Sequence, residues 1–483
     1  MRSEIKLYCI LLLMGMSCPC WADFTVTKVG DSVVDPTALT LNRVHPYYGG
    51  VCINAVHCQQ DAVVTHEKHQ YMAYYDAERR LCMARRKLPA GEWSSIRFTD
   101  YVFKKNDDHC TVCIGLCPQD GTLHLAFGAH NGALTYRVSR QGVATHPESV
   151  TWEASLFGPI VSELEKGKPP ATITYPRFWQ TPDGGLQFGY RTGFAGKGDR
   201  WLVDYEADTG TWRNTRQIDS GLQGTYEDAL AKTTWRCSYP NGYDYGPLGR
   251  LHVTWTWREH QPGDTANHDI MYAYSEDRGN TWRNNQGELL AGPPHVESPG
   301  IKVVDVSRAH SLTNTQSQAV DSQGRIHTVM WHTTDETLKA AKMKLEHYQE
   351  CWGLPDARRY HHYWRDDNGT WQHRQLPWQS GTIGKLFMDE EDNAYLVYGA
   401  TNRYMIKFHD EDHNCTIAAA SAKSKWTDWN VIHVEKGNFF NDMLGDLYRW
   451  KKEGVLSVMV QESPKEDGAP SALRMLDFSL GKD

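Results

Sequence analysis

The stretch Asp120-Gly121-Thr122-Leu123-His124-Leu125 joins a glycine turn to a hydrophobic strand that carries one polar residue inside it. Similar turn-and-strand modules recur at intervals of about 50 to 75 residues. Between them, short runs rich in Trp, Tyr, Thr and Val alternate with Gly, Asp and Asn turns, which indicates an all-β chain. The clear copies are Asp183–Phe188, Gly249–Val253 and Gly324–Thr328, and the weaker copies are His69–Ala73 and Asp392–Leu396.

Repetition at this period, with about four strands in each unit, is typical of a β-propeller. The segment Ser275–Trp282 matches the pattern S-x-D-x-G-x-T-W, the Asp box, whose Asp and Trp hold a hairpin on the outside of a blade. A further copy near residues 441–460 is expected to close against the first strands of the mature chain. The copies favour seven blades over six or eight, so the predicted fold class is all-β, a seven-bladed β-propeller with Asp-box repeats.

The N-terminal segment has the layout of an export signal, with two basic residues, an apolar run over residues 7–16 and small residues ending at Ala22. Such a segment is removed during secretion. We therefore predict a signal peptide over residues 1–22 and one propeller catalytic domain over residues 23–483. The mature protein is expected to be secreted, in the periplasm or at the cell surface.

The apolar run is too short to span a bilayer, and no later stretch approaches the roughly 20 apolar residues that a membrane helix requires. Lipidation at Cys18 or Cys20 is the alternative fate of this segment, but both cysteines lack the leucine usually found three residues earlier. We expect a monomer without a membrane span.

The net charge is −8, and it is spread along the chain without a basic block. This distribution excludes the electrostatic footprint of a nucleic-acid-binding protein. A polyanionic partner would therefore have to meet positive charge that the fold gathers locally.

Of the 12 cysteines, three lie in the signal segment, so the mature chain keeps nine. An odd count of this size cannot hold the fold by disulfides, and at least one cysteine must stay a thiol or bind a metal. Cys110 and Cys113 have C-x₂-C spacing, but strand alternation would point them to different faces. Packing thiols or disulfide partners are therefore favoured there over metal ligands.

The residues of a functional site are expected where the inner strands of successive blades begin, because the ends of these strands line one face of a propeller. Aligning the copies on the turn glycine places a ring-bearing side chain ahead of each of four inner strands. Other polar side chains follow the strands on the same side. The residues ahead of the strands are His109, Tyr175, Tyr239 and His310, with Asn314 near the last, and those that follow are His130, Arg191 and Arg258.

Each of these residues also has a structural interpretation. A single tyrosine at a strand start, such as Tyr239, is commonly a half-buried packing residue. His124, His252 and His327 occupy one repeated position inside strands, and we predict that they are structural histidines that stack blade against blade. A structural interpretation of His109, His130, Tyr175 and Arg191 would require these four polar residues to meet on one rim by coincidence. A functional role is therefore favoured for this set.

The rim set suits elimination beside a uronic acid. Such a lyase must neutralise the carboxylate, remove the C5 proton and return a proton to the leaving oxygen at C4. An arginine fork holds a carboxylate at two points, and His and Tyr can carry the two proton transfers.

The motifs around these residues resemble the active-site motifs of the BNR-type seven-bladed ulvan lyases, over about residues 51–462. The resemblance implies that His109 is the proton donor and acceptor and that Arg191 is the carboxylate-neutralising group. Tyr175, which occupies the matching place one blade on, is the third predicted catalytic residue and would complete the acid–base pair with His109. The resemblance also implies substrate binding or auxiliary proton transfer by further residues. The motifs are D-D-H at His109, A-H-N at His130, T-Y-P-R at Tyr175 and G-Y-R-x-G at Arg191, and the expected substrate-binding residues are His130, Tyr239, Arg258 and His310, with Tyr243 and Tyr245 as alternatives to Tyr239.

The resemblance implies no cofactor for the chemistry but does imply a structural metal ion, zinc or calcium. His347 and Cys351 stand four residues apart with His361 following, which is compatible with zinc ligation. The full set of candidate ligands is His260, His268, His347, Cys351 and His361, with His362 beside the last.

Two other functions compete with the lyase interpretation. A sialidase-like glycoside hydrolase would need an arginine triad and a Tyr/Glu nucleophile pair, and Arg177, Arg191 and Arg258 do not assemble into that pattern in the sequence. A non-catalytic carbohydrate-binding propeller would use the abundant Trp and Tyr as platforms for sugars.

Overall fold

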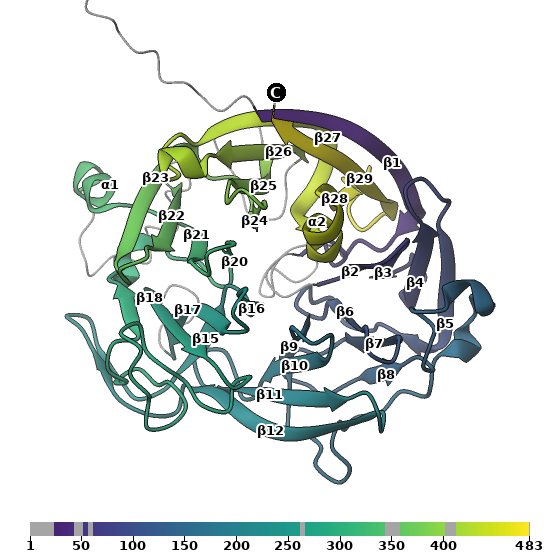
Figure 1. Cartoon of the computed structure of the whole chain (residues 1–483), viewed down its shortest axis with the longest axis horizontal. Helices are drawn as coiled ribbons and strands as arrows, with labels where there is room; N and C mark the ends of the chain where they lie inside the picture. Colours follow the sequence, from purple (N-terminus) through teal and green to yellow (C-terminus); the bar gives the residue numbers. More distant parts are fainter. Residues whose placement is uncertain are drawn as a thin grey trace, which may run out of the picture.

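The computed structural model describes residues 24–42, 52–56, 61–260, 266–342, 358–400 and 412–482. Antiparallel sheets stand around a central channel like the blades of a propeller (Figure 1). The predicted signal segment over residues 1–22 lies outside the described residues. Within the described ranges, no helix has the length and apolar character needed to cross a membrane.

The first four blades follow one another along the chain. The first contains β2 (Val63–His66), β3 (His69–Tyr75), β4 (Arg80–Lys87) and β5 (Ser94–Val102). The second contains β6 (Val112–Cys117), β7 (Thr122–Phe127) and β8 (Tyr136–Val138). The third contains β9 (Thr174–Gln180), β10 (Leu186–Arg191), β11 (Asp199–Glu206) and β12 (Thr211–Ser220). The fourth contains β15 (Arg236–Pro240), β16 (Asp244–Tyr245), β17 (Leu251–Glu259), β18 (Asn267–Ser275) and β19 (Lys302–Val304).

Three more blades complete the ring. The fifth contains β20 (Ser317–Val320), β21 (Ile326–His332), β22 (Arg359–Arg365) and β23 (Trp371–Gln379). The sixth contains β24 (Lys385–Met388), β25 (Ala394–Ala400), β26 (Asp412–Ala420) and β27 (Asn430–Gly445). The seventh contains the end of β27 with β28 (Val455–Glu462), β29 (Ser471–Lys482) and β1 (Phe24–Ala38).

Short elements connect the blades. A hairpin of β13 (Tyr226–Glu227) and β14 (Lys232–Thr233) precedes the fourth blade. In the described ranges, the α-helices are α1 (Asp335–Ala340) and α2 (Leu447–Glu453), and the 3-10 turns are Pro147–Ser149, Ala154–Leu156, Arg308–His310 and Ala422–Ser424.

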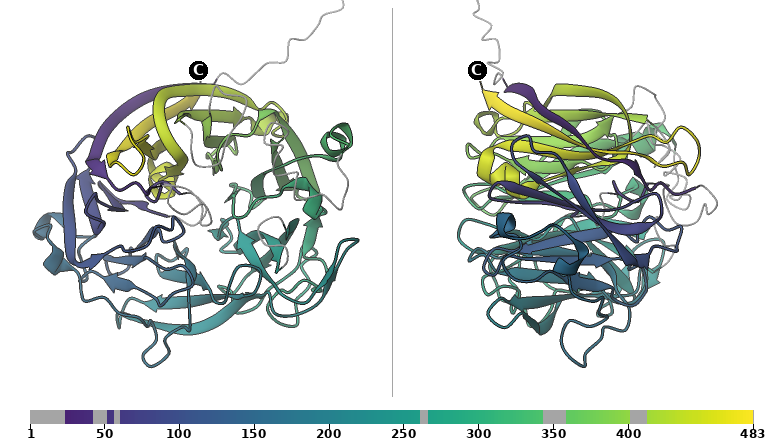
Figure 2. Two further views of the ribbon diagram at one scale, coloured as in Figure 1. Left: turned by 180° about the vertical axis from the view of Figure 1, so that it is seen from behind. Right: turned by 90° about the vertical axis from the view of Figure 1, so that its right-hand side faces the viewer.

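The two ends of the described chain meet in the seventh blade. β1 pairs with β29 from Phe24 opposite Lys482 to Ala38 opposite Ser471. The two strands lie side by side at the rim of the ring (Figures 1 and 2). The predicted seven-bladed fold and its closure by the C-terminal copy are thereby confirmed.

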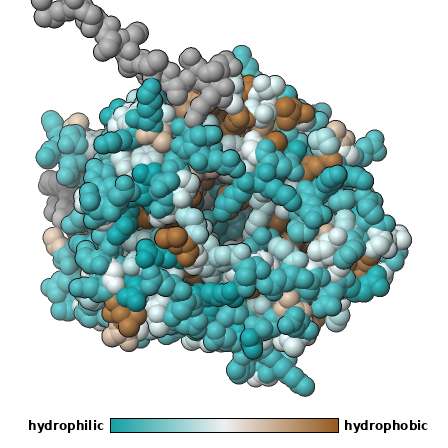
Figure 3. Space-filling model, in the orientation of Figure 1, coloured by the Kyte–Doolittle hydropathy of each residue, from teal (hydrophilic) through white to brown (hydrophobic). Residues whose placement is uncertain are grey.

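Burial separates the inner strands from the outer ones. Every residue of β6, β7 and β17 is buried, because these strands are covered by their neighbouring blades on both sides. The outer strand β5 instead alternates between buried and exposed residues, as expected for a strand with one face toward water. The apolar core is thus divided among the contacts between blades, and Figure 3 shows a largely hydrophilic surface hollowed at the centre of the ring.

Two of the three repeated strand histidines, His124 and His327, pack against the next blade, as predicted, whereas His252 bonds within its own blade. His124 is fully buried, and its ring contacts Tyr205 of the third blade at a centroid distance of 4.5 Å. His252 hydrogen-bonds the Tyr272 hydroxyl at 2.8 Å, and His327 packs its ring against Trp426 at 4.5 Å. These three side chains are structural.

The Asp box forms the expected turn at the outer end of β18. The Asp277 carboxylate accepts hydrogen bonds from the Thr281 amide and hydroxyl at 2.8 and 2.7 Å. Trp282 closes the turn and is buried in the core of the fourth blade. The motif therefore stabilises a blade and lies outside the rim described below.

Cys110 and Cys113 lie in different apolar clusters, as strand alternation predicts. Cys113 donates to the Pro176 carbonyl at 2.8 Å, and the next cysteine, Cys117, is buried beside the Gly184 carbonyl. Their role as packing thiols is confirmed, because no disulfide joins the cysteines within the described ranges.

Candidate active site

The candidate site lies where the inner strands of the second, third and fourth blades begin. His109 stands three residues before β6, Tyr175 is the second residue of β9, and Tyr239 lies in β15. The ring of Tyr175 is 6.1 Å from that of His109 and 5.8 Å from that of Tyr239, between centroids. The prediction that these three residues share one face is confirmed.

One carboxylate, that of Asp107, holds both rim histidines. His109 Nδ1 lies 2.9 Å from Asp107 Oδ1, and His130 Nδ1 lies 2.5 Å from Oδ2. The two imidazoles stack with centroids 4.5 Å apart and an angle of 15° between their planes. The sequence places Asp107 close to His109, but the bond to His130 depends on the return of the chain after β7 and has no signal in the sequence.

The two histidines differ in charge. Burial lowers the pKa of His109, but Asp108 and Asp107 outweigh that effect and raise the pKa to about 10. Burial lowers the pKa of His130 by more than the hydrogen bond to Asp107 raises it, and the charge of the neighbouring His109 adds to the lowering. At neutral pH the pair therefore consists of one imidazolium, His109, beside one neutral imidazole, His130.

Tyr175 has a backbone conformation that a bulky residue rarely adopts. Its φ angle is +59°, in the left-handed region, where a side chain costs about 1 to 3 kcal/mol. The pairing of β9 with β10 shifts register at this point, between Gly189 and Arg191. A bulge of this kind re-aims a side chain, and strained residues concentrate at functional sites. The strain supports the predicted catalytic role of Tyr175.

Arg191, the last residue of β10, is fully buried without a carboxylate partner in the described part of the chain. Its Nη1 lies 3.2 Å from the Tyr239 hydroxyl and 3.6 Å from the Cys237 thiol. Its Nε and Nη2 have no hydrogen-bond partner among the described residues. These two atoms form one edge of the guanidinium fork, the edge that binds a carboxylate at two points.

The setting of Arg191 differs from the sequence-based expectation in one respect. In the sequence alone, the glycines at positions 189 and 193 on either side of Arg191 predict room for a ligand. The space beside Gly189 is occupied by the Trp179 ring, and the space beside Gly193 by the Lys197 carbonyl. That interpretation was wrong, because the glycines accommodate neighbouring parts of the protein.

Tyr239 is the tyrosine of its segment that reaches the site. Its ring lies between Arg191 and Arg258, with the Arg258 guanidinium 4.4 Å from the ring centroid. Tyr243 stacks on Trp179 at 4.2 Å, and the Tyr245 hydroxyl donates to Gln187. Tyr243 and Tyr245 therefore pack inside the blades.

Arg258 and Cys237 support this tyrosine from the same blade. Arg258 donates to Asn267 at 3.0 Å and to Asn314, which fixes its guanidinium behind the Tyr239 ring. Cys237 was not among the predicted site residues. Since it stands two residues before Tyr239 in β15, strand alternation was the signal that could have found it.

His310 is not joined to this set by any contact in the described ranges. Its Nδ1 lies 2.9 Å from the Ser307 hydroxyl, its Nε2 lies 3.1 Å from Asp335, and its ring packs against His332. The alignment of the repeats correctly placed His310 ahead of the inner strand β20. The 3-10 turn Arg308–His310, however, directs its side chain toward α1. The prediction that His310 binds substrate has no support from the geometry.

The described candidate metal ligands do not fit a common site. Both ring nitrogens of His268 are taken, by Asp269 at 2.9 Å and Glu259 at 3.1 Å. His361 contacts His373 and the His332 carbonyl, whereas His260 packs against Trp235. His347 and Cys351 lie outside the described residues. The structural metal ion stays a prediction.

One group in the described ranges does bring three potential ligand atoms within 4.8 Å of one another, namely Asp107, His109 and His130. Both histidine Nδ1 atoms face the same carboxylate at hydrogen-bond distance. A proton on each Nδ1 satisfies this arrangement, and we interpret the group as a hydrogen-bonded pair of imidazoles.

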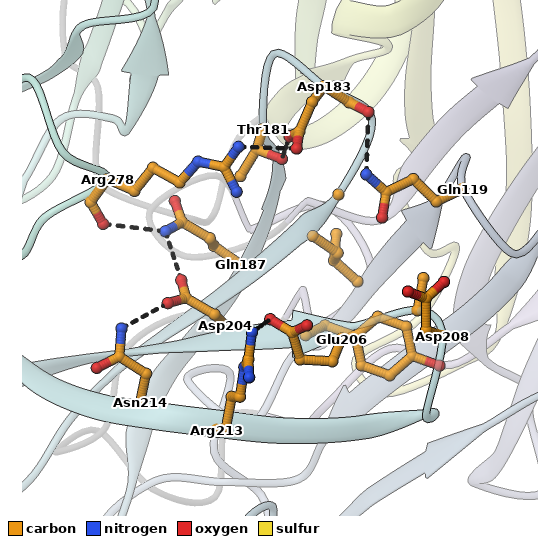
Figure 4. Close-up of a pocket in the computed structure, with 14 residues that line it drawn as sticks. Gln119, Thr181, Asp183, Gln187, Asp204, Glu206, Asp208, Arg213, Asn214 and Arg278 are labelled. Atoms are coloured by element: carbon orange, nitrogen blue, oxygen red, sulfur yellow. Dashed lines mark hydrogen bonds and ion pairs between the residues drawn. The ribbon is translucent and has the colours of Figure 1, made fainter.

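A cavity of about 580 Å³ lies at the opposite end of the blades, beside the turn between β9 and β10 (Figure 4). Its charged groups pair with each other: Arg278 donates to Asp183 at 2.7 Å, and Arg213 contacts Glu206 at 2.7 Å. Further acids, Asp204 and Asp208, also line it. This excess of acids opposes an anionic substrate, so the cavity is not the candidate site.

A sialidase-type arginine triad is not assembled. Arg177 pairs with Asp61 at 2.9 Å beside the central channel, and Arg258 is held by asparagines behind Tyr239. Arg191 alone of the three presents an unpaired edge within the described ranges.

Comparison with known proteins agrees with this geometry. The ulvan lyase, long isoform, of Pseudoalteromonas sp. (strain PLSV) is 25% identical over 318 residues, which make up 56% of this chain and 31% of that protein. The short isoform of Alteromonas sp. (strain LOR) is 23% identical over 313 residues, 55% of this chain and 56% of that protein. The chain thus matches about a third of the length of the long isoforms. The resemblance stated from the four motifs is confirmed.

Solved structures share the fold over almost the whole chain. The crystal structure of the polysaccharide lyase Uly1 superposes with a TM-score of 0.68 at 17% identity, covering 94% of this chain and 99% of that one. A PL25 ulvan lyase bound to -[GlcA(1-4)Rha3S]- gives 0.63 at 14% identity, covering 91% and 95%. Residues 69–378 match the family described as BNR repeat-containing family member. Because this match extends over more than half of the sequence, the chain belongs to the BNR repeat-containing family.

Proposed function

We propose that the protein is a secreted polysaccharide lyase that cleaves a sulfated, uronic acid-containing polysaccharide of the ulvan type by β-elimination. The observation that carries the proposal is the fully buried Arg191, whose Nε and Nη2 have no partner within the described ranges. A buried cation without a counter-charge is costly, and a substrate carboxylate would supply that charge. The relatives named ulvan lyases support the choice of polymer.

In this proposal Arg191 binds the uronate carboxylate at two points and stabilises the negative charge that develops when C5 loses its proton. The C5–H bond breaks, the C4–O bond breaks, and a double bond forms between C4 and C5. His109 is charged at neutral pH, so it can deliver the proton that the leaving oxygen at C4 requires.

Tyr175, in its deprotonated form, takes the C5 proton and becomes a phenol. It stands on the blade next to His109, with ring centroids 6.1 Å apart, so both side chains can reach the same sugar unit. The neutral His130 is the alternative base, since it shares Asp107 with His109. Tyr239 packs against Tyr175 and His130 against His109, and in this proposal both bind the sugar.

Entry of the carboxylate requires a side-chain movement. The Tyr175 ring covers Arg191, with the guanidinium carbon 4.8 Å from the ring centroid. We expect the carboxylate to displace this ring as it binds, since the guanidinium is fully buried. The movement would bring the Tyr175 hydroxyl beside the bound sugar.

One assay separates the three functions considered from the sequence. A lyase produces an unsaturated uronyl end that absorbs ultraviolet light, a hydrolase produces reducing ends without this absorbance, and a binding module produces neither. We expect ultraviolet absorbance on ulvan. Reducing ends alone, or binding without cleavage, would refute the lyase assignment.

The decisive variant is His109→Ala, with His433→Ala on β27 as the matched control. Loss of an acid–base group costs about 10²- to 10⁴-fold in turnover, so the ultraviolet signal should disappear while binding to the polymer remains. The control should keep wild-type turnover. If His109→Ala retains more than about a tenth of that turnover, the proton transfer belongs to His130 or Tyr175 instead.

A further inference from the structure

Next to Arg191, the loop between β10 and β11 presents an aromatic and a cationic group at the surface. Phe194 of this loop is 59% exposed. Trp235, which stands directly before β15, is 44% exposed and lies beside the loop. Every other tryptophan in the described ranges is buried or half-buried. An exposed aromatic surface beside a polar site is a common feature of ligand-binding regions.

The fold fixes this loop against the fourth blade. The Gly196 amide donates to the Cys237 thiol at 3.0 Å, and the Gly198 amide donates to the Arg236 carbonyl at 3.0 Å. Gly196 has a φ of +70°, and a side chain there would come within 2.5 Å of the His260 backbone. Only glycine lets the loop backbone come this close to His260, so Gly196 helps to determine the position of the loop.

Lys197 follows directly and places its ammonium group 3.4 Å from the centre of the Trp235 ring. It has no carboxylate partner in the part of the chain that the structure describes. A lysine over an indole keeps its charge available to an anion. The same Cys237 thiol that receives the Gly196 amide lies 3.6 Å from Arg191 Nη1, so the loop adjoins the proposed carboxylate clamp.

We propose that Trp235 and Lys197 form an accessory subsite that holds an anionic sugar unit of the polymer, next to the unit cut at Arg191. The exposed part of the Trp235 indole contacts the sugar ring, Lys197 pairs with its sulfate or carboxylate, and Phe194 extends the apolar surface. The occupant follows from charge and continuity, because the subsite carries a cation with no carboxylate partner in the described ranges and borders the clamp. The inference rests on the proposed lyase function.

The test compares Trp235→Ala and Lys197→Gln with two matched controls, Leu248→Ala and Lys436→Gln. Leu248 is 81% exposed at the turn after β16, on the opposite end of the blades, and Lys436 is exposed on β27. Initial rates on ulvan give kcat and KM, and affinity electrophoresis in ulvan gels gives binding without turnover. We expect KM to rise about tenfold in both test variants with kcat changed less than twofold, since binding outside the reacting unit acts mainly on KM. The controls should match the wild type.

A second arm identifies the anion. On chemically desulfated ulvan, Lys197→Gln should equal the wild type if the lysine binds sulfate, and should keep its tenfold loss if it binds a carboxylate. Either result supports the subsite. An unchanged KM and gel mobility for both test variants on both polymers would overturn it, whereas a wild type that releases no unsaturated ends would overturn the lyase function itself.

Discussion

Two sets of buried arginines in this protein have opposite surroundings. In the first and seventh blades, Arg86 and Arg449 both donate to Asp477 at 2.8 Å, and Ser457 adds a third donor at 2.7 Å. In the third blade, Arg191 is equally buried, but within the described ranges its only hydrogen-bond partners are a tyrosine hydroxyl and a thiol.

The difference distinguishes arginines that stabilise the fold from the arginine that is proposed to bind a ligand. Removing a guanidinium from water is costly, and the Asp477 network offsets the cost within the fold. At Arg191 the fold leaves one edge of the fork unpaired within the described ranges. Such an arrangement is stable enough to persist and becomes complete only with a ligand that brings its own negative charge.

The largest effect is expected from breaking the structural network. Replacing Asp477 by Asn leaves two buried guanidinium groups without their shared counter-charge. Removing one partner of a buried pair costs about 3 to 5 kcal/mol, so the free energy of unfolding from urea titration should fall by that amount. Folded protein should keep wild-type turnover. A loss below about 1 kcal/mol would mean that the network is not what stabilises this closure.

The next effect is on catalysis. Arg191→Lys keeps the positive charge but loses the fork, and turnover should fall about 10²- to 10³-fold, the cost of one transition-state donor. The melting temperature should hardly change. The matched variant Arg86→Lys should do the reverse, lowering stability without lowering turnover. Equal losses of stability and turnover in Arg191→Lys would identify a structural arginine.

A smaller effect is expected at the carboxylate that orients both histidines. In Asp107→Asn the amide can accept from one imidazole only, so one ring loses its fixed tautomer. Turnover should fall about tenfold, less than the loss of an acid–base group itself. Steady-state rates at pH 7 measure it, with His130→Ala as the comparison. Full wild-type turnover would show that the stacked pair needs no orienting acid.

The smallest effect is a shift in pH dependence. The folded-state pKa of His109, about 10, lies above its ordinary 6.5, so this group stabilises the fold fully below pH 6.5 and loses its contribution as the pH rises to 10. The same deprotonation should end activity on the alkaline side. Asp108→Asn removes the main charge that raises this pKa, and the alkaline limb of kcat/KM should move down by about one pH unit. An unmoved limb would assign it to another group.

Local chemistry determined much of this protein. The repeated turn and strand define the blades, because a hydrophobic strand with two covered faces reads as a nearly continuous apolar run. The offset of His109 and Tyr175 from the turn glycines places both on one rim, since equivalent positions in a repeat occupy equivalent positions in space. These features depend on spacing along the chain and can be read without a structure.

Only the tertiary structure decided which polar groups remain unpaired. Tyr239, Tyr243 and Tyr245 lie close together in the sequence, so the sequence does not tell which of them reaches the site. In the fold, Tyr243 packs on Trp179 and Tyr245 bonds to Gln187, which leaves only Tyr239 of the three at the site. His310 has the expected offset, and a short 3-10 turn directs it to Asp335. The open edge of Arg191 depends on which side chains other blades bring near it, and those contacts join residues far apart in the chain. Contacts between residues far apart in the chain leave no periodic pattern in the sequence. The sequence could therefore identify Arg191 as a candidate but could not show that two of its donor atoms lack a partner within the described ranges.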